Sequence, residues 1–269
     1  MSTQGRMMSN KEFFSLSDIY VAYRKAKADA FYETTHYYAL AFTEYEQRLH
    51  ANLVRLQRRL RDPDQSWASD RSFIGDYAYL PKSIQAPPED EEAGHFKALD
   101  PLQDWRRRFE NSHTRAKASF RLVICATVDF QIVSALWILK VGYLFDDAID
   151  RDLSFGNRLR VEIAGYDDAE LPIRRPNLRT TGLFSPYFSA YQRWRENGLS
   201  AMEQALKHGQ EIIAMTLDIE QFYHRISPQF LLRDSFLSAV GVSLNEAQKE
   251  FTDHLLEAVN AWYRATPQR

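Results

Sequence analysis

The sequence predicts a helix-rich α+β fold, and three observations lead to this class. Apolar residues recur at helical spacing from about Ser17 to Arg61 and again in several later stretches. Two short runs, residues 120–126 and 211–218, are continuously apolar or rich in β-branched residues and predict strands. The 269 residues are 45% hydrophobic and 26% charged, which is ordinary for a globular protein with a real core and excludes overall disorder.

The pattern divides the chain into three segments. Residues 1–61 form a helical extension, one long helix or two stacked helices, which ends at Asp62-Pro63. Residues 62–101 hold much of the glycine and proline together with an acidic run, so we expect a loop-rich linker with one short strand near residues 77–80. Residues 102–269 alternate predicted strands with predicted helices.

In this third segment, each element has its own signal. Asp129 can cap a helix that follows the strand at 120–126. Ser185-Pro186 would open another helix, which Gly198 would close before a short helix stopped by Gly209. The apolar run 211–218 would be a buried strand that ends on a carboxylate.

The C-terminal region predicts two further helices. The first begins at Ser227-Pro228 and ends at Gly241, and Ser243 with Glu246 would form a capping box for the last helix. One face of the last helix is expected to be apolar and consists of Phe251, Leu255, Val259 and Trp262.

Charge is balanced overall and clustered locally. With 34 Lys and Arg against 36 Asp and Glu, the formal net charge is −2. The net charge therefore gives no overall electrostatic attraction to nucleic acid. Basic residues cluster at 48–61, at 106–121 and near Arg174, while acids cluster at 89–92 and 146–150. These blocks fit a basic groove for RNA or a solvated helical surface, and charge alone favours the solvated surface.

Cysteine usage and hydropathy predict a cytoplasmic protein. The single cysteine, Cys125, excludes an internal disulfide and a cysteine-based zinc site, and the seven histidines are dispersed. The first thirty residues contain no apolar signal core. The most apolar stretch, 122–139, is interrupted by polar side chains, so we expect a core segment and no membrane partner.

Asp218 is the residue best placed for chemistry. A carboxylate where an apolar strand meets a loop is held by the core yet faces open space, which suits a hard oxygen ligand for Mg²⁺. An isolated aspartate at such a position more often caps a turn. The residues around Asp218 decide between the two interpretations.

The segment MTLDIEQFYHRI, residues 215–226, resembles motif A of reverse transcriptases, with an apolar strand, an aspartate, an apolar residue, two variable positions and two aromatics. Upstream, FRLVICATVDFQIVSALW and SFGNRLR resemble the fingers of bacterial reverse transcriptases. The three elements keep the family's order and cover about residues 115–262. The segments YLPKSI and WRENGLSAMEQAL are most similar to the defence-associated, antiviral group. The resemblance implies a helical extension followed by the fingers and a partial palm.

The resemblance also implies roles for individual residues. Asp218 matches the catalytic, metal-binding aspartate of motif A, and the carbonyl of Ile219 would be a backbone ligand of the same Mg²⁺. Tyr223 matches the aromatic that excludes a 2′-hydroxyl, although an ordinary core aromatic is an equal alternative. Arg121 matches the fingers arginine that holds the incoming triphosphate. Lys117 could assist Arg121.

Arg158 matches the last position of the S-[YF]-G-x-R element, where a structural ion pair is an alternative to nucleotide binding. Motifs B and C of the family are absent after motif A. The tripeptide Tyr166-Asp167-Asp168 precedes motif A in a predicted loop, and motif C requires a β-hairpin between buried strands, which the sequence does not predict there.

The resemblance thus implies the N-terminal part of an RNA-directed DNA polymerase, a nucleotidyltransferase. It would use Mg²⁺, deoxynucleoside triphosphates, an RNA template and a DNA or RNA primer. The alternative is a non-catalytic RNA-binding scaffold that pairs with a second polymerase or defence subunit. We expect residues 1–269 alone to lack polymerase activity and to expose the apolar face of the last helix.

Overall fold

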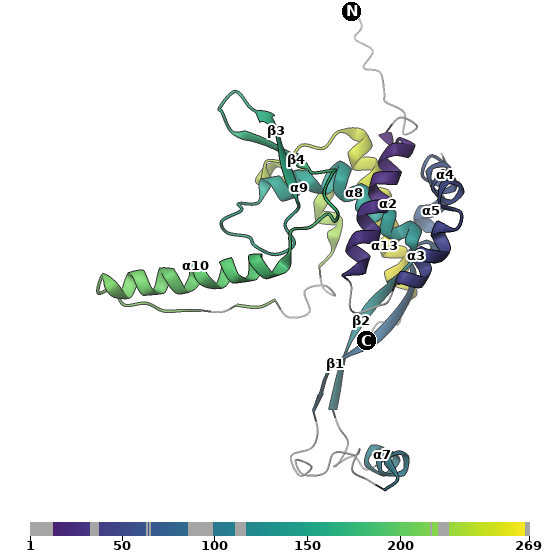
Figure 1. The fold of residues 1–269 in the computed structure, drawn as a ribbon, viewed down its shortest axis with the longest axis horizontal. Helices are drawn as coiled ribbons and strands as arrows, with labels where there is room; N and C mark the ends of the chain where they lie inside the picture. Colours follow the sequence, from purple (N-terminus) through teal and green to yellow (C-terminus); the bar gives the residue numbers. More distant parts are fainter. Residues whose placement is uncertain are drawn as a thin grey trace, which may run out of the picture. The chain divides into compact units, whose positions relative to one another are not determined.

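The structure is a computed structural model that describes residues 13–32, 38–62, 64, 66–85, 99–110, 117–215, 217–219 and 226–266 (Figure 1). Helices dominate it and two small antiparallel sheets accompany them, so the predicted helix-rich α+β class is confirmed. The chain forms two compact units. Unit 1 combines residues 1–74 with 127–269, and unit 2 comprises residues 75–126. The division at residues 61 and 101 stays a prediction.

The N-terminal region of unit 1 is helical, as predicted, and it is broken into short helices. Its helices are α2 (Leu16–Phe31), α3 (Ala39–Glu46), α4 (Leu49–Leu60), α5 (Ser66–Ser69) and α6 (Arg71–Ile74). Ser15 and Asp18 form a capping box at the start of α2. The predicted leucine face of α4 lies in the core, where Leu53, Leu56 and Leu60 are buried.

One helical run passes through the centre of unit 1. It consists of α8 (Val128–Trp137), a single π-helical segment η3 (Ile138–Gly142) and α9 (Tyr143–Ala148). The cap of α8 is Thr127, whose hydroxyl accepts from the amide of Phe130 at 3.0 Å, and not Asp129 as predicted. The carboxylate of Asp129 is held instead by Tyr45 and Arg55.

The run Val128–Ala148 is long and apolar enough to cross a membrane, judged by length and composition only. The core helix of a soluble protein meets the same criterion. Here α8 packs against α2 and buries Ile132, Val133 and Leu136 almost completely. Only 39% of the most apolar window of the run is buried. Burial therefore supports a core role for α8, whereas residues 122–126 of the expected core segment 122–139 belong to β2 in unit 2.

A buried lysine joins α2 to the segment before α10. Lys25 is 1% exposed, and its ammonium donates to the carbonyl oxygens of Asn177, Thr180 and Gly182 and to the Thr180 hydroxyl at 2.5–3.1 Å. Burial lowers the pKa of Lys25 to about 8. On the same helix, the carboxylate of Asp29 accepts from the amide of Leu183 at 3.1 Å. These bonds fix residues 177–183 to α2.

Unit 2 contains a long two-stranded ribbon and one helix. Strands β1 (Gly75–Gln85) and β2 (Lys117–Ala126) pair antiparallel, with a register shift between Pro81 and Ser83. The strand at 120–126 is confirmed, and the expected short strand near 77–80 is longer than predicted because it pairs with β2 along its length. Helix α7 (Pro101–Glu110) belongs to the same unit.

Unit 1 contains a hairpin that the sequence does not predict. Strands β3 (Val161–Tyr166) and β4 (Pro172–Pro176) pair antiparallel. Tyr166-Asp167-Asp168 lies at its turn, where a loop was expected. Neither strand contains a buried residue, so this is not the hairpin between buried strands that motif C requires. The Asp167 carboxylate accepts from the amides of Ala169 and Leu171, which gives this aspartate a turn-forming role.

Helix α10 (Tyr187–Lys207) is the longest helix, and none of its residues is buried. It runs through Gly198, so the predicted break there was wrong, and it ends before Gly209 with its positive φ of 70°. The described residues of 211–219 form no strand and are exposed. The strand expected at 211–218 is therefore wrong for this structure, because no neighbouring strand pairs with it among the described residues.

Two short helices and a long one complete unit 1. They are η4 (Pro228–Leu232), α12 (Asp234–Val240) and α13 (Glu246–Ala265). Gly241 ends α12 in the left-handed conformation, as predicted. The capping box of α13 is formed by Asn245 and Gln248, not by Ser243 and Glu246.

Helix α13 does not expose its apolar face, contrary to the expectation. It packs against α5 and α6 and buries Phe251, Leu256 and Trp262. The N-terminal helices supply this cover, which the sequence alone could not show because they lie almost 200 residues upstream.

Candidate functional site

Asp218 lies in an extended, exposed segment that follows α10. One oxygen of its carboxylate accepts from the amide of the next residue, Ile219, at 2.9 Å. No side chain of the described residues bonds to it. Its neighbours Ile213, Met215 and Leu217 are 94%, 76% and 84% exposed. The carboxylate is therefore open to solvent and available to a ligand.

The residues present supply only part of a magnesium site. A carboxylate oxygen and a backbone carbonyl, here from Asp218 and Ile219, are hard ligands that suit Mg²⁺. In the part of the chain that the structure describes, no three His, Cys, Asp or Glu residues gather closely enough to hold a metal ion. Tyr223 lies outside the described residues, so its proposed contact with the sugar stays a prediction.

Arg121 lies on β2 in unit 2, opposite Leu80 of β1. Its side chain is exposed and has no hydrogen-bond or ion-pair partner within the described part of the chain. Lys117 begins the same strand, opposite Gln85. Arg121 and Asp218 belong to different units, so their roles at one nucleotide remain predictions.

Arg158 has a structural role in this fold. It is 7% exposed and pairs with Asp146 at 2.8 Å. Its remaining four N–H groups donate to the backbone carbonyls of Asp146, Ile149, Asp150 and Ser154 at 2.6–3.3 Å. Because all five donors are used, the geometry favours the structural alternative over nucleotide binding.

Two of the predicted basic residues are also engaged. Arg55 pairs with Asp129 at 3.0 Å, and Arg59 pairs with Asp70 and lies over the ring of Phe73. In the same cluster, Arg48 and Arg58 are exposed, and their guanidinium groups have no partner in the described residues. These two arginines are the ones that α4 offers to a polyanion.

Comparison of the chain with protein-family models, curated proteins and solved structures finds no match. Within the described residues, the charged groups of Asp218 and Arg121 have no side-chain partner, whereas Arg158, Arg55 and Arg59 form ion pairs within the fold.

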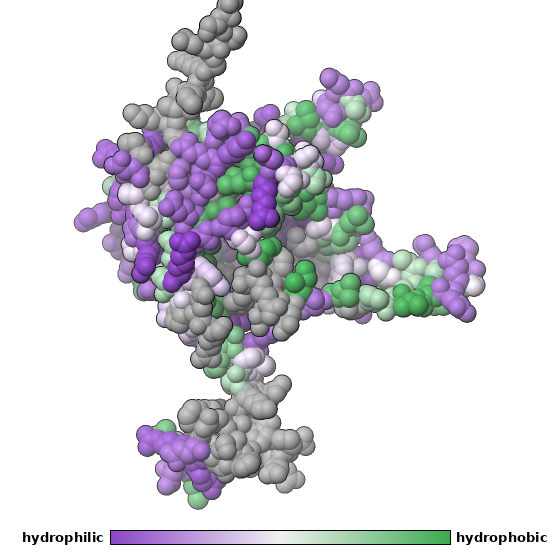
Figure 2. All heavy atoms as spheres, turned by 180° about the vertical axis from the view of Figure 1, so that it is seen from behind, coloured by the Kyte–Doolittle hydropathy of each residue, from purple (hydrophilic) through white to green (hydrophobic). Residues whose placement is uncertain are grey.

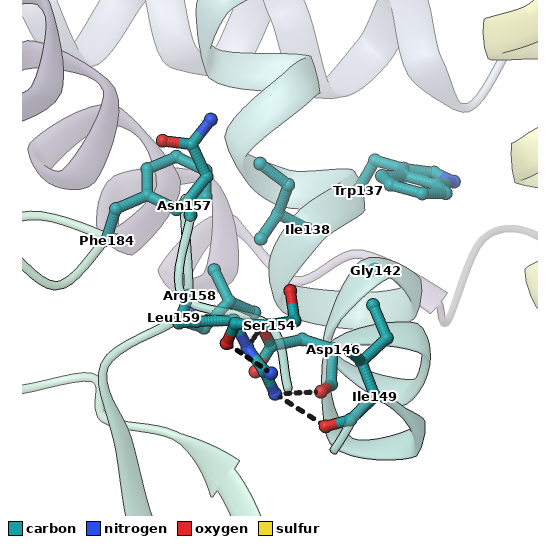
Figure 3. Close-up of a pocket in the computed structure, with 11 residues that line it drawn as sticks. Trp137, Ile138, Gly142, Asp146, Ile149, Ser154, Asn157, Arg158, Leu159 and Phe184 are labelled. Atoms are coloured by element: carbon teal, nitrogen blue, oxygen red, sulfur yellow. Dashed lines mark hydrogen bonds and ion pairs between the residues drawn. The ribbon is translucent and has the colours of Figure 1, made fainter. Parts of the chain in front are cut away.

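A pocket that the sequence analysis did not predict lies beside Arg158 (Figure 3). It is an open hollow of about 200 Å³ between the π-helical segment η3 and the loop of residues 154–159. Its lining consists of Trp137, Ile138, Gly142, Asp146, Ile149, Ser154, Gly156, Asn157, Arg158, Leu159 and Phe184. Two features of the sequence could have indicated this pocket. They are Gly142, a glycine inside an apolar helix, and Asn157, which directly precedes Arg158.

Proposed function

We propose that this chain is the N-terminal part of an RNA-directed DNA polymerase, which adds deoxynucleotides to a DNA or RNA primer on an RNA template. The segment 215–226 carries the proposal, because its apolar run leads to Asp218 and two aromatics follow at the spacing of motif A. The exposed Asp218 carboxylate supports this role, since no other side chain of the described residues occupies it. Antiviral defence and a cytoplasmic location belong to the same proposal.

In this proposal, Asp218 and the Ile219 carbonyl hold one Mg²⁺ ion. When bound, Mg²⁺ would stabilise the charge that develops on the attacking and leaving oxygens during phosphoryl transfer. The chain's own residues orient the nucleotide. Arg121, assisted by Lys117, would bind the triphosphate, and Tyr223 would exclude a 2′-hydroxyl by steric contact.

The exposed segment around Asp218 supports a partial palm. Ile213, Met215, Leu217 and Ile219 alternate along it and are all more than two-thirds exposed. Such alternation is typical of a strand with one face in a core, and it is stable only when neighbouring strands pair with it. The sheet of a complete polymerase palm would supply those strands.

The second candidate is a non-catalytic RNA-binding scaffold that retains the fingers. Unpaired, exposed arginines favour it. Arg48 directly before α4, Arg58 on α4, and Arg106 and Arg121 in unit 2 have no partner in the described residues. Such guanidinium groups neutralise phosphates without reading sequence.

Primer extension separates the two candidates. A protein that contains this chain would be incubated with a primed RNA template, Mg²⁺ and deoxynucleotides, and RNA binding would be measured in parallel. Template-dependent incorporation supports the polymerase. RNA binding without incorporation supports the scaffold, and the absence of both contradicts both proposals.

A further inference from the structure

The pocket beside η3 has fixed walls. The Trp137 indole donates to the Thr252 hydroxyl at 3.0 Å and stacks with Phe145. A Cβ on Gly142 would lie 2.8 Å from the Trp137 ring, so a glycine at this position leaves room for the indole. A π-helical turn such as η3 is often found at functional sites.

The opposite wall is held by a network of hydrogen bonds. Arg158 uses all five N–H groups within the fold, and its backbone carbonyl accepts from the amide of Ser185 at 2.8 Å. Leu159 forms a β-bridge with Phe184, another lining residue. Both walls are therefore set before any ligand arrives, which reduces the entropy that binding would cost.

The lining offers no net charge to a ligand. Asp146 and Arg158 are its only charged residues, and they pair with each other at 2.8 Å. Trp137, Ile138, Leu159 and Phe184 make the rest largely apolar. An ion would lose its hydration without gaining an unpaired partner, so the pocket favours a neutral occupant.

Two polar side chains in the lining remain unpaired. Asn157 is exposed and Ser154 is half-buried, and neither the amide of Asn157 nor the hydroxyl of Ser154 has a hydrogen-bond partner in the described residues. Figure 3 shows the Asn157 amide directed away from the Arg158–Asp146 pair. An amide offers a donor beside an acceptor, which matches the edge of a nucleobase. Asn157 also has a positive φ of 49°, a conformation that asparagine tolerates better than most residues.

We propose that this pocket binds one flat, neutral heterocycle of the nucleobase class, with apolar side chains on its faces and the Asn157 amide at its edge. Its 200 Å³ is below the ~300–1,000 Å³ of typical small-molecule sites, which limits the occupant to about one ring system. The base can come from a free nucleoside or from a single strand of RNA. This site does not involve Asp218 and stands apart from the proposed polymerase chemistry.

Isothermal titration calorimetry tests the proposal with the chain as it exists. Adenosine, uridine and a short single-stranded RNA are the probes, and benzoate serves as a flat but charged control. We expect a nucleoside or the RNA to bind and benzoate not to bind. If the RNA binds and the nucleosides do not, the pocket holds a base that is part of an RNA strand.

The variant Asn157→Gly removes the amide and suits the positive φ, so the fold should be unaffected. We expect binding to weaken about threefold to tenfold, as the loss of one hydrogen bond implies. Ile138→Trp, which fills the pocket, should abolish binding, and Asn197→Ala on the exposed α10 should leave it unchanged. Binding that survives both pocket variants, or the absence of binding by every base-containing probe, overturns the proposal.

Discussion

The ammonium of Lys25 is buried at the contact between α2 and residues 177–182, where it donates to four oxygens. At pH 7 it stays charged, because its pKa of about 8 lies above that value. Replacing it with methionine removes the buried ammonium and leaves the single hydroxyl proton of Thr180 as the remaining side-chain donor to the carbonyls of Asn177 and Gly182. We expect Lys25→Met to lower the free energy of unfolding by roughly 2–4 kcal/mol in urea denaturation.

Lys27→Met is the matched control, because Lys27 is about half exposed and pairs only with Glu46. Its effect should stay below about 1 kcal/mol, as for other exposed ion pairs. If the free energy of unfolding falls equally in the two variants, the hydrogen bonds from Lys25 to residues 177–182 contribute no more to stability than an exposed ion pair does.

Substitutions at two pairs of arginines in and next to α4 distinguish an effect on RNA binding from an effect on stability. Arg48 and Arg58 are exposed and unpaired in the described residues, so Arg48→Glu with Arg58→Glu should weaken RNA binding and flatten its salt dependence. The melting temperature should be unchanged. Arg55→Glu with Arg59→Glu should instead lower the melting temperature, because both arginines form ion pairs within the fold. If the first variant binds RNA with unchanged affinity, Arg48 and Arg58 do not contact RNA and are only solvent-exposed surface residues.

At the scale of elements, α10 offers a direct test. Gly198 lies inside this exposed helix, and a Cβ added there would meet nothing within 4 Å. Because alanine favours a helix more than glycine does, Gly198→Ala should raise the free energy of unfolding by about 0.5–1 kcal/mol. A lower stability or altered association in this variant would indicate that another surface approaches the helix closely at Gly198.

Elements with local signals were predicted, and elements that depend on distant partners were not. The strand at 120–126 and the end of α12 at Gly241 follow from their own residues. The β3–β4 hairpin was missed because its turn contains none of the short hairpin dipeptides. The run 211–218 has strand composition, yet a strand exists only where another strand pairs with it.

At the scale of the whole molecule, apolar side chains gather along α10 and the segment after it. Figure 2 shows hydrophobic residues along the α10 extension. Tyr187, Phe188 and Trp194 on the helix are 60%, 81% and 55% exposed, and Ile213 and Leu217 beyond it are more exposed still. Patches of this kind promote association in solution.

We therefore expect the chain to self-associate as its concentration rises, measured by sedimentation velocity. Ile213→Ser with Leu217→Ser should reduce this association without changing the melting temperature, because both side chains are exposed. Leu153→Ser is the control, since Leu153 is 80% exposed but lies in a different loop. A chain that stays monomeric at all concentrations, or an equal effect of the control, would contradict this expectation.

The candidate site could be predicted only as separate residues. The resemblance to motif A and to the fingers singled out Asp218 and Arg121, and both side chains are exposed and free of ion pairs in the described residues. The structural role of Arg158 could not be chosen from sequence, because its partner carbonyls come from a loop whose path depends on the whole fold.

Primer extension with Asp218→Asn tests the central proposal most directly. The assay uses a polymerase containing this chain, a primed RNA template and Mg²⁺, with Asp253→Asn as the control because Asp253 is an exposed aspartate on α13. Asparagine keeps the shape of the side chain but removes the charge that binds the metal ion. The account predicts that Asp218→Asn abolishes incorporation while the protein stays folded and the control remains active. Undiminished incorporation by the folded Asp218→Asn variant would contradict it.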